Sequence, residues 1–395
     1  MSQINIRNLS NENDDGSPEI VGVSTFSATS FFVPPKGSTA ERPSDCEPGS
    51  IRFNTDTANL EYFRGKTIGW SQFELVTPNL GGGTGSNTGF GVRGIFVGGY
   101  SPAQTSNIEY ITISTLGDSQ DFGDLSNNYS AGAATNDRTR GFYSGGNTGN
   151  QLDMLLCTLA SLGNSVDSGG DLYVATKGHP TGCSSSTRGV IMGGRNSSGD
   201  EVNVIQYHTI QTNGNSADFG DLAAPRGYNG GNCNSSTRGL SIGGYSPDAP
   251  TRVNTIEFVT MASLGDALDF GDISYVANSL GSASNSTRGI IAAGRTPTAV
   301  RNIEFVTIAS AGNATDFGDL IASGQYNYVR GDVGCCSSST RCVIGGGGTG
   351  GTSGGAAMQY VEIATTGNGI EFGALTVADD ASQEPGMWST GHGGL

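Results

Sequence analysis

The sequence predicts an all-β protein made of many short strands, and three observations lead to this class. Glycine accounts for 64 of the 395 residues and proline for 13, and both residue types interrupt long regular elements. Charged residues make up only 14%, whereas helical bundles need long faces rich in lysine, glutamate and alanine. The third observation is an internal repeat whose segments alternate with a period of two.

The repeat unit is about 50 residues long and occurs six times between Gly91 and the end of the chain. In the copy that starts at Arg288, the order is Arg-Gly-Ile-Ile-Ala-Ala-Gly, a loop, Asn-Ile-Glu-Phe-Val-Thr-Ile and Asp-Phe-Gly-Asp-Leu. The copies start at intervals of 47, 48, 50, 50 and 53 residues, at Arg93, Arg140, Arg188, Arg238, Arg288 and Arg341. Such a repeat predicts one small unit of secondary structure per copy, which needs its neighbours to bury its faces.

Each copy predicts four short strands. Residues 256–260 alternate in character as a strand does, and the apolar run 188–192 ends at a glycine doublet that suits a tight turn. Residues 269–273 form a third short element, and pairs such as Gly265-Asp266 suit hairpin turns. The small residues before each arginine, such as 229–237, predict a strand packed near an axis where only Gly, Ser, Cys and Ala fit.

Four strands per copy in six copies predict a six-bladed β-propeller over residues 81–395. The tail Gly386–His392 is similar to the small-residue strand that precedes each arginine, but no seventh unit follows it. We therefore expect it to pair beside Arg93–Gly99 and close the ring, because closure leaves no exposed sheet edge. The second copy lacks the Phe at 167–172, so its blade is expected to be the least well packed.

The repeats resemble the kelch family of β-propellers, in which a Gly-Gly doublet follows an apolar strand and an aromatic and a spaced Trp come after it. The doublets are Gly98-Gly99, Gly145-Gly146, Gly193-Gly194, Gly243-Gly244 and Gly345-Gly346, with Ala293-Gly294 as a variant. The Trp position is held by Phe122, Phe219, Phe270, Phe317 and Phe372. The resemblance implies four-stranded blades, and a shared fold says little about function.

The first 80 residues differ in composition from the repeats. Residues 1–50 are predicted to form an extended docking arm, and residues 51–80 a β-hairpin module that turns at 55–59. An isolated hairpin is marginally stable, so we expect docking on a partner through the aromatic residues Phe31, Phe32, Tyr62, Phe63 and Trp70. The glycine-rich segment 81–87 is predicted to be a linker.

The segment 49–70 resembles a short module of bacteriophage tail-fibre and other virion structural proteins, with cyanophages the nearest group. The resemblance rests on Gly-Ser-Ile-Arg-Phe-Asn-Thr-Asp-Thr, then Leu-Glu, an aromatic, Gly and Trp. It implies a virion protein made in the host cytoplasm, whose N-terminal arm binds other virion proteins. Two roles stay open: a tail-fibre or appendage component that binds a host surface glycan or protein through the propeller, and a purely structural capsid or tail decoration or connector. A homo-oligomer also stays open.

Charge and cysteine content narrow the choice of partners. The formal net charge is −16, which disfavours binding to nucleic acid. No apolar run approaches the roughly 18 residues of a membrane-spanning helix, and the N-terminus lacks the pattern of a signal peptide. The seven cysteines fit the spacing of neither a zinc site nor a disulfide framework, so we expect small buried thiols.

Catalytic chemistry is not predicted. The three histidines are His179, expected in an exposed loop, His208, expected at the edge of the core, and His392. No hydrolase, zinc-protease or phosphate-loop motif occurs, so we expect no enzyme activity, no cofactor and no catalytic or metal residues. The Asp-rich turns leave calcium binding open, although the spacing of an EF-hand loop is absent.

Two sets of repeated positions are candidate sites. The repeat arginines are predicted to form structural ion pairs between blades with Asp121, Asp218, Asp221, Asp269 and Asp316. The residue after each doublet varies while the rest of the unit is regular, which predicts recognition loops on one face at Tyr100, Asn147, Arg195, Tyr245 and Arg295. The alternative is that the residue at this position varies among repeats without any role in binding.

Overall fold

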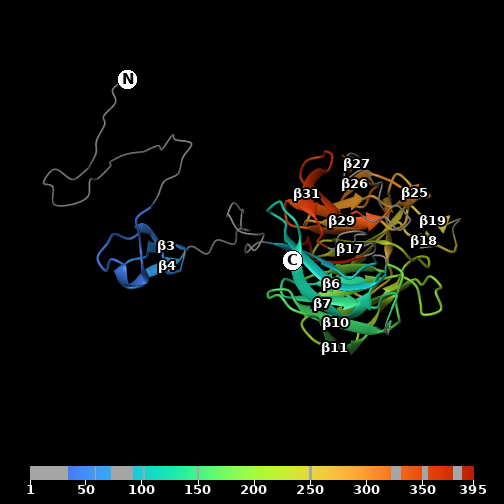
Figure 1. The fold of residues 1–395 in the computed structure, drawn as a ribbon, viewed down its shortest axis with the longest axis horizontal. Coiled ribbons are helices and arrows are strands. Elements are labelled where there is room, and N and C mark those ends of the chain that lie inside the picture. Colours follow the sequence, from blue (N-terminus) through green and yellow to red (C-terminus); the bar gives the residue numbers. More distant parts are fainter. Residues whose placement is uncertain are drawn as a thin grey trace, which may run out of the picture. The chain divides into compact units, whose positions relative to one another are not determined.

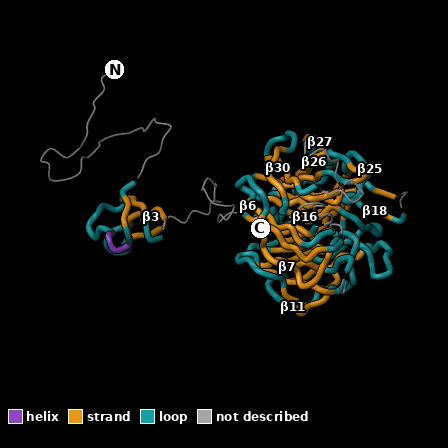
Figure 2. Tube along the Cα trace, viewed as in Figure 1, coloured by secondary structure: helices purple, strands orange, loops and turns teal. Residues whose placement is uncertain are grey.

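A computed structural model describes residues 34–57, 59–72, 92–100, 103–148, 151–248, 251–321, 331–348, 355–376 and 385–395 (Figure 1). The chain divides into two compact units, Met1–Val76 and Thr77–Leu395, each of which is described by itself. Both units are built from strands, with one short 3₁₀ helix in the first (Figure 2). The all-β class is therefore confirmed. The predicted linker at 81–87 and the docking residues Phe31 and Phe32 lie outside the described residues.

Unit 1 contains one four-stranded sheet. Its elements are β1 (Lys36–Gly37), the 3₁₀ helix η1 (Thr39–Glu41), β2 (Ile51–Asn54), β3 (Asn59–Phe63) and β4 (Trp70–Gln72). Strands β2 and β3 pair antiparallel, with Ile51 opposite Tyr62, which confirms the predicted hairpin. Strand β1 pairs parallel with β2, and β4 pairs with β3 so that Phe63 lies opposite Trp70.

One face of the unit 1 sheet buries charged side chains. Glu61 is fully buried, with Arg42 Nη2 at 2.7 Å and Arg52 Nε at 3.3 Å from its carboxylate oxygens. Asn54 Nδ2 donates to the same carboxylate at 3.1 Å. Burial alone would raise the pKa of Glu61, but hydrogen bonds from Arg42 and Asn54 lower it below its usual value. Such a buried ion cluster holds a geometry more than it adds net stability.

Unit 2 contains six four-stranded antiparallel sheets, one for each repeat. We number these sheets 1 to 6 in the order of their repeat arginines. In chain order, each of sheets 2 to 6 consists of a small-residue first strand, the strand that begins at the repeat arginine, the third strand, and the outer strand. Sheet 1 takes its first strand from the C-terminus: it consists of β32 (Gly386–Ser389), β5 (Arg93–Val97), β6 (Thr105–Thr112) and β7 (Gln120–Tyr129).

The other five sheets follow along the chain. Sheet 2 consists of β8 (Ala133–Asn136), β9 (Arg140–Ser144), β10 (Asp153–Thr158) and β11 (Val166–Asp171), and sheet 3 of β12 (Thr181–Ser184), β13 (Arg188–Met192), β14 (Val204–Thr209) and β15 (Ala217–Asp221). Sheet 4 consists of β16 (Gly230–Asn234), β17 (Arg238–Ile242), β20 (Thr255–Thr260) and β21 (Leu268–Asp272), and sheet 5 of β22 (Gly281–Ser284), β23 (Arg288–Ala292), β26 (Asn302–Thr307) and β27 (Thr315–Asp319). Sheet 6 consists of β28 (Gly331–Ser337), β29 (Arg341–Gly348), β30 (Ala357–Glu362) and β31 (Ile370–Ala374).

The C-terminal strand completes the first sheet. Strand β32 pairs antiparallel with β5, with Gly386 opposite Val97 and Ser389 opposite Gly94. This is the pairing predicted from the sequence of the tail. The first and the last strand of unit 2 that the structure describes are therefore held in one sheet by main-chain hydrogen bonds.

Neighbouring sheets contact each other through their first strands. Each first strand contacts the next one: β8 contacts β12, β12 contacts β16, β16 contacts β22, β22 contacts β28, β28 contacts β32, and β32 contacts β8. In five of the six sheets, a turn glycine donates its N–H to the outer strand of the preceding sheet, for example Gly265 to the carbonyl of Phe219 at 2.9 Å. Sheet 3 is joined to sheet 2 by Ser216 instead, which donates its N–H to the carbonyl of Asp171 at 2.8 Å. The glycine bond also joins Gly117 of sheet 1 to Phe372 of sheet 6 at 2.9 Å, so this series also returns to its start.

The residue after each turn glycine strengthens this link. Its side-chain oxygen accepts the N–H of the last residue of the preceding Asp-Phe-Gly-Asp motif or its equivalent. The pairs, at 2.9–3.1 Å, are Asn164 with Asp124, Asn215 with Asp171, Asp266 with Asp221, Asn313 with Asp272, Asn368 with Asp319 and Asp118 with Ala374. The Gly-Asn and Gly-Asp pairs that predicted hairpins therefore also join adjacent sheets.

The Arg-Gly motif makes room for the neighbouring first strand. A Cβ atom on Gly141 would lie 2.6 Å from the ring of Trp388, and one on Gly239 would lie 2.9 Å from Cys183. Sheet 6 has Cys342 in place of this glycine, and the first strand of sheet 5 presents Ala283 at the corresponding position in the same buried cluster. The larger residue on one side is thus matched by a smaller one on the other.

Sheet 2 departs from the pattern of the others. Five sheets contain an edge-to-face aromatic pair whose ring centroids are 5.9–6.1 Å apart, such as Phe258 with Phe270. In sheet 2 the corresponding residues are Leu156 and Ser168, and an aromatic ring occurs instead at Phe142, directly opposite Leu156. The prediction that this sheet is the least well packed remains a prediction.

Candidate functional site

The five predicted recognition residues all follow the second strand of their sheets, so they lie at the same end of each sheet. We call this end the long-loop face. Tyr100 is 40% exposed, and Asn147 donates to Ser130 Oγ at 3.3 Å. Tyr245 begins the short ladder of β18 (Tyr245–Ser246) with β19 (Thr251–Arg252), and Arg295 begins that of β24 (Arg295–Thr296) with β25 (Thr298–Ala299).

The arginines on this face are held by charged and aromatic neighbours. Arg195 Nε donates to Glu201 Oε1 at 2.8 Å, and its Nη1 donates to the hydroxyl of Tyr228 at 2.8 Å. Its guanidinium carbon lies 4.9 Å from the centre of the Tyr228 ring. In the corresponding loop of sheet 5, Arg295 forms an ion pair with Asp332. These loops are therefore braced by side-chain contacts as well as by their own short ladders.

A cavity of about 60 Å³ lies at the same end, where the first strands begin. It is lined by residues from all six sheets, among them Ala134, Pro180, Asn229, Ser282, Val333 and Met387. This volume is enough for about four water molecules. Within the described residues, no group donates a hydrogen bond to Oδ1 of the buried Asn229 side chain. The exposed lining of the cavity is mostly polar.

His179 joins the cavity to the long loops. It lines the cavity, and its ring centre lies 5.4 Å from that of Tyr228, which contacts Arg195. His179 was expected to be exposed, and this is wrong in part, because the side chain is half-buried between these neighbours. The sequence could not place it, since the contact with Tyr228 joins residues of two different repeats.

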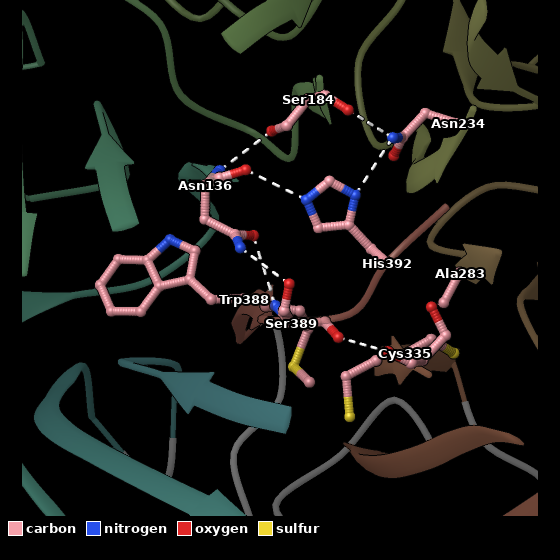
Figure 3. A pocket seen from close by; sticks show the side chains of 11 residues that line it. Asn136, Ser184, Asn234, Ala283, Cys335, Trp388, Ser389 and His392 are labelled. Atoms are coloured by element: carbon pink, nitrogen blue, oxygen red, sulfur yellow. Dashed lines mark hydrogen bonds between the residues drawn. The ribbon is translucent and has the colours of Figure 1, made fainter. Parts of the chain in front are cut away.

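The opposite end of the first strands is closed by a ring of polar side chains (Figure 3). The last residue of the first strand is Asn136, Ser184, Asn234, Ser284, Ser337 or Ser389 in the six sheets. Each residue hydrogen-bonds to its neighbour, for example Asn136 N to Ser184 Oγ at 2.9 Å and Ser337 Oγ to the carbonyl of Ser284 at 2.7 Å. Asn136 Nδ2 donates to the carbonyl of Ser389 at 2.8 Å and completes the circuit.

The C-terminal residues fill the space inside this ring. The His392 ring contacts the carbonyl of Asn136 at 3.0 Å through Nε2, and its Nδ1 lies 3.3 Å from Asn234 Nδ2 (Figure 3). The same Nδ1 lies 3.1 Å from the N–H of Gly394. Because Nδ1 faces two donors, it is the acceptor, and Nε2 carries the proton. Burial lowers the pKa of His392 to about 4. The residual void beside it is only about 10 Å³.

The predicted ion pairs of the repeat arginines are wrong. Among the described residues, none of the six arginines pairs with Asp121, Asp218, Asp221, Asp269 or Asp316. Five of them instead donate to a main-chain carbonyl of the next sheet at 2.7–3.0 Å: Arg93 to Leu159, Arg188 to Met261, Arg238 to Ile308, Arg288 to Ile363 and Arg341 to Ser114. Arg140, in the divergent sheet, donates to Asn213 Oδ1.

The aromatic residue of the same sheet supports each of these arginines. The guanidinium carbon lies 4.2 Å from the ring centre of Phe305 in the case of Arg288, and 4.5 Å from that of Phe258 in the case of Arg238. A guanidinium can thus be held by a ring and a carbonyl without a carboxylate. Arg341 is the exception, because its Nε also donates to Glu362 Oε1 at 2.8 Å in an ion pair within its own sheet. One of these aspartates, Asp221, lies near other carboxylates instead: burial and the nearby Asp266 and Asp218 raise its pKa.

Sequence reasoning missed a set of buried acceptors between the sheets. A Glu or Gln on the third strand is buried and accepts a main-chain N–H that follows the outer strand of the preceding sheet. The acceptors are Glu109, Gln206, Glu257, Glu304 and Gln359, at 2.8–3.2 Å. Their recurrence before each aromatic residue was a usable signal. Glu257 also forms a fully buried ion pair with Arg226.

The remaining polar and sulfur groups serve the core. Cys157, Cys183, Cys233, Cys335, Cys336 and Cys342 are buried and free, as predicted, and Cys46 is half-buried and free. His208 is buried, with Nε2 at 2.8 Å from Thr135 Oγ1, and burial lowers its pKa to about 4. The described part of the chain holds no cluster of three or more His, Cys, Asp or Glu side chains that could bind a metal ion.

Comparison with known proteins identifies no relative: no family model and no curated protein matches this chain. In the residues that the structure describes, no helix has the length and apolar character needed to cross a membrane.

Proposed function

We propose that unit 2 is a six-bladed β-propeller that binds a ligand on its long-loop face, and that the chain is a phage virion component that attaches to the host surface in this way. Three features support the propeller, because each forms a closed series that returns to the sheet where it begins. They are the contacts among first strands, the hydrogen bonds between turns and outer strands, and the ring of polar side chains that includes Asn136 and Ser389. Such returns are expected of six sheets packed around one axis.

The observation that carries the binding proposal is the difference between the two ends of the first strands. One end is filled by His392 and the residues around it, and leaves a void of about 10 Å³. The other end holds a cavity of about 60 Å³ beside loops that differ among repeats and are braced by Arg195, Glu201 and Tyr228. Variable loops on a regular scaffold are the usual place for recognition.

The virion assignment is supported by the resemblance of residues 49–70 to tail-fibre modules and by the hairpin that these residues form. In this proposal the N-terminal arm attaches the chain to other virion proteins. Of the predicted docking residues, Phe63 is buried and its ring lies 5.4 Å from that of Trp70, so these two hold unit 1 together. Trp70 Nε1 also donates to the carbonyl of Pro43 at 3.0 Å.

The test is binding of the full chain to envelope fractions of candidate cyanobacterial hosts. We expect binding to be saturable and to be weakened at least about tenfold by Tyr100→Ala combined with Tyr228→Ala. The matched control is Leu264→Ala, which changes an exposed residue in a turn at the opposite end. Absence of binding to every fraction, or equal loss with the control, refutes the attachment role.

A structural role as a decoration or connector is the second candidate, and one observation favours it. Leu116, Leu162 and Leu264 occupy the same turn position in three sheets and are 57%, 53% and 56% exposed. Repeated exposed leucines on one end of a unit suit a protein contact. Location of the chain in intact particles separates the two roles: a decoration or connector has this end buried in virion contacts, whereas an attachment protein has its long-loop face exposed.

A further inference from the structure

The turn before the outer strand of sheet 3 differs from the corresponding turns of the other sheets. Its glycine follows Asn213, whereas the other turn glycines follow Leu116, Leu162, Leu264, Ala311 and Thr366. The pair Asn213-Gly214 is exposed to solvent. In an Asn-Gly pair the main-chain nitrogen of the glycine can attack the side-chain amide, because glycine has no Cβ to hinder the approach.

The main-chain nitrogen of Gly214 is not engaged in a bond between sheets. In the other five turns the glycine N–H donates to the outer strand of the preceding sheet, as that of Gly265 does to Phe219. Among the described residues, the N–H of Gly214 donates to no main-chain carbonyl. Sheet 2, which precedes it, has Ser168 where the other outer strands have Phe. The Gly214 nitrogen can therefore react without loss of a hydrogen bond.

The side-chain amide of Asn213 is bonded to a cation. Arg140 Nη2 donates to Asn213 Oδ1, whereas the other five repeat arginines donate to main-chain carbonyls. A guanidinium can only donate, so its acceptor has to be the oxygen of the amide. A positive donor at this oxygen stabilises the negative charge that the oxygen acquires when a nucleophile adds to Cγ. The arrangement therefore favours attack on this amide.

We propose that Asn213 is a site of spontaneous deamidation and that Arg140 promotes the reaction. The Gly214 nitrogen loses its proton and forms a bond to Asn213 Cγ, and the bond from Cγ to Nδ2 then breaks. Ammonia leaves with that proton, and a cyclic imide remains. Water opens the ring at either carbonyl and gives an aspartate or an isoaspartate at position 213. The net reaction consumes one water and releases one ammonia, so it needs no oxidant or reductant.

The product changes the contact between sheets 2 and 3. In the aspartate form, the new carboxylate lies beside Arg140 and replaces a neutral acceptor by a charged one. The two sheets are then joined by an ion pair that the unmodified chain lacks. The modification is independent of ligand binding, so its absence would leave the proposed attachment unaffected.

The two other Asn-Gly pairs of the chain serve as internal controls. Asn368 precedes Gly369, whose N–H donates to the carbonyl of Asp319 at 2.8 Å, and Asn368 Oδ1 accepts the N–H of Asp319 at 3.0 Å. Asn229 is buried and precedes Gly230, which lies in the ladder of β16 with β17. We therefore expect both pairs to react only slowly in the folded chain.

The test is peptide mapping by mass spectrometry of the full chain, incubated at neutral pH in heavy-oxygen water, which labels each new carboxylate. We expect Asn213 to be modified at least about tenfold faster than Asn368 or Asn229 in the folded chain, and all three at similar rates in urea. Gly214→Ala should slow the reaction, because the added Cβ hinders the attack. It should leave the fold intact, since the nearest non-adjacent atom, Thr212 Oγ1, would be 4.0 Å away.

The role of the arginine is tested by Arg140→Gln, which should slow modification of Asn213 at least about threefold in the folded chain and leave it unchanged in urea. The matched control is Arg188→Gln, which removes the equivalent bond to Met261 in the next sheet and should leave the rate at Asn213 unchanged. Slow reaction at the two control pairs in the same sample shows that a variant is folded.

Equal rates at the three Asn-Gly pairs of the folded chain overturn the proposal, as does an Asn213 that reacts only in urea. A rate that Gly214→Ala leaves unchanged overturns the attack by the glycine nitrogen. A rate that Arg140→Gln leaves unchanged or raises overturns the role of the arginine, as does an equal decrease in Arg188→Gln.

Discussion

Protonation of His392 should destabilise unit 2 in mild acid. In the folded chain, burial lowers the pKa of this ring from 6.5 to about 4, and its Nδ1 accepts from Gly394 and faces Asn234 Nδ2. The unfolded chain therefore binds the proton near pH 6.5 and the folded chain only near pH 4. Stability from this group is complete above pH 6.5, falls as the pH decreases between 6.5 and 4, and is constant below that.

The size of the effect follows from the shift. One pKa unit corresponds to about 1.4 kcal/mol, so the full loss is roughly 3 kcal/mol at pH 4 and about 2 kcal/mol at pH 5. The comparison is His392→Gln, which can donate and accept hydrogen bonds but does not titrate. The His208 ring has a similarly low pKa, but it is present in both proteins and cancels from the difference.

The assay is urea unfolding followed by the fluorescence of Trp388, in a Trp70→Phe background that leaves it as the only tryptophan. Trp388 is fully buried beside the polar ring, so its emission reports on this region. We expect the free energy of unfolding of the wild type to fall relative to His392→Gln by about 2 kcal/mol between pH 7 and pH 5. If the difference between the two proteins is the same at both pH values, the proposed neutral buried histidine is refuted.

Three further predictions concern the packing of the sheets. Gly141→Ala should destabilise unit 2 by about 2 kcal/mol in urea unfolding, because the added Cβ would lie 2.6 Å from the Trp388 ring, and an effect below about 0.5 kcal/mol would contradict the tight contact. Arg288→Gln should cost about 1–2 kcal/mol through loss of the carbonyl bond and of the stacking on Phe305, and raised salt should leave this cost unchanged, whereas a salt-sensitive cost would indicate an ion pair. His208→Val, which restores the residue type of other repeats, should remove part of the acid sensitivity of unfolding, and an unaltered pH profile would count against the buried neutral ring.

Local pattern was sufficient to predict the elements. The period of two, the glycine doublets and the repeat interval predicted four strands per copy, and the sheets have the strands in that order. The pairing of Gly386–Ser389 with Arg93–Val97 was also predictable, because the tail has the residue types of a first strand and one sheet would otherwise lack it. The small side chains of the first strands likewise predicted their crowded position.

The partners of polar side chains were less predictable. Each repeat has one arginine and often two aspartates, which suggested ion pairs, but five of the six guanidinium groups reach a main-chain carbonyl of the next sheet. A carbonyl has no signature in a sequence, since every residue carries one. The same limit applies to His179 and Tyr228, whose contact joins two repeats.

The sequence by itself determined the strands of this protein, because alternation, turn residues and repetition are local properties that act within a few residues. Only the tertiary structure decided which polar groups meet, where the cavity lies and which end the His392 segment fills. Those outcomes depend on how six sheets and a C-terminal segment are placed side by side, and residues such as Asn136 and Ser389 come together only when strands 253 positions apart in the chain are packed in contact.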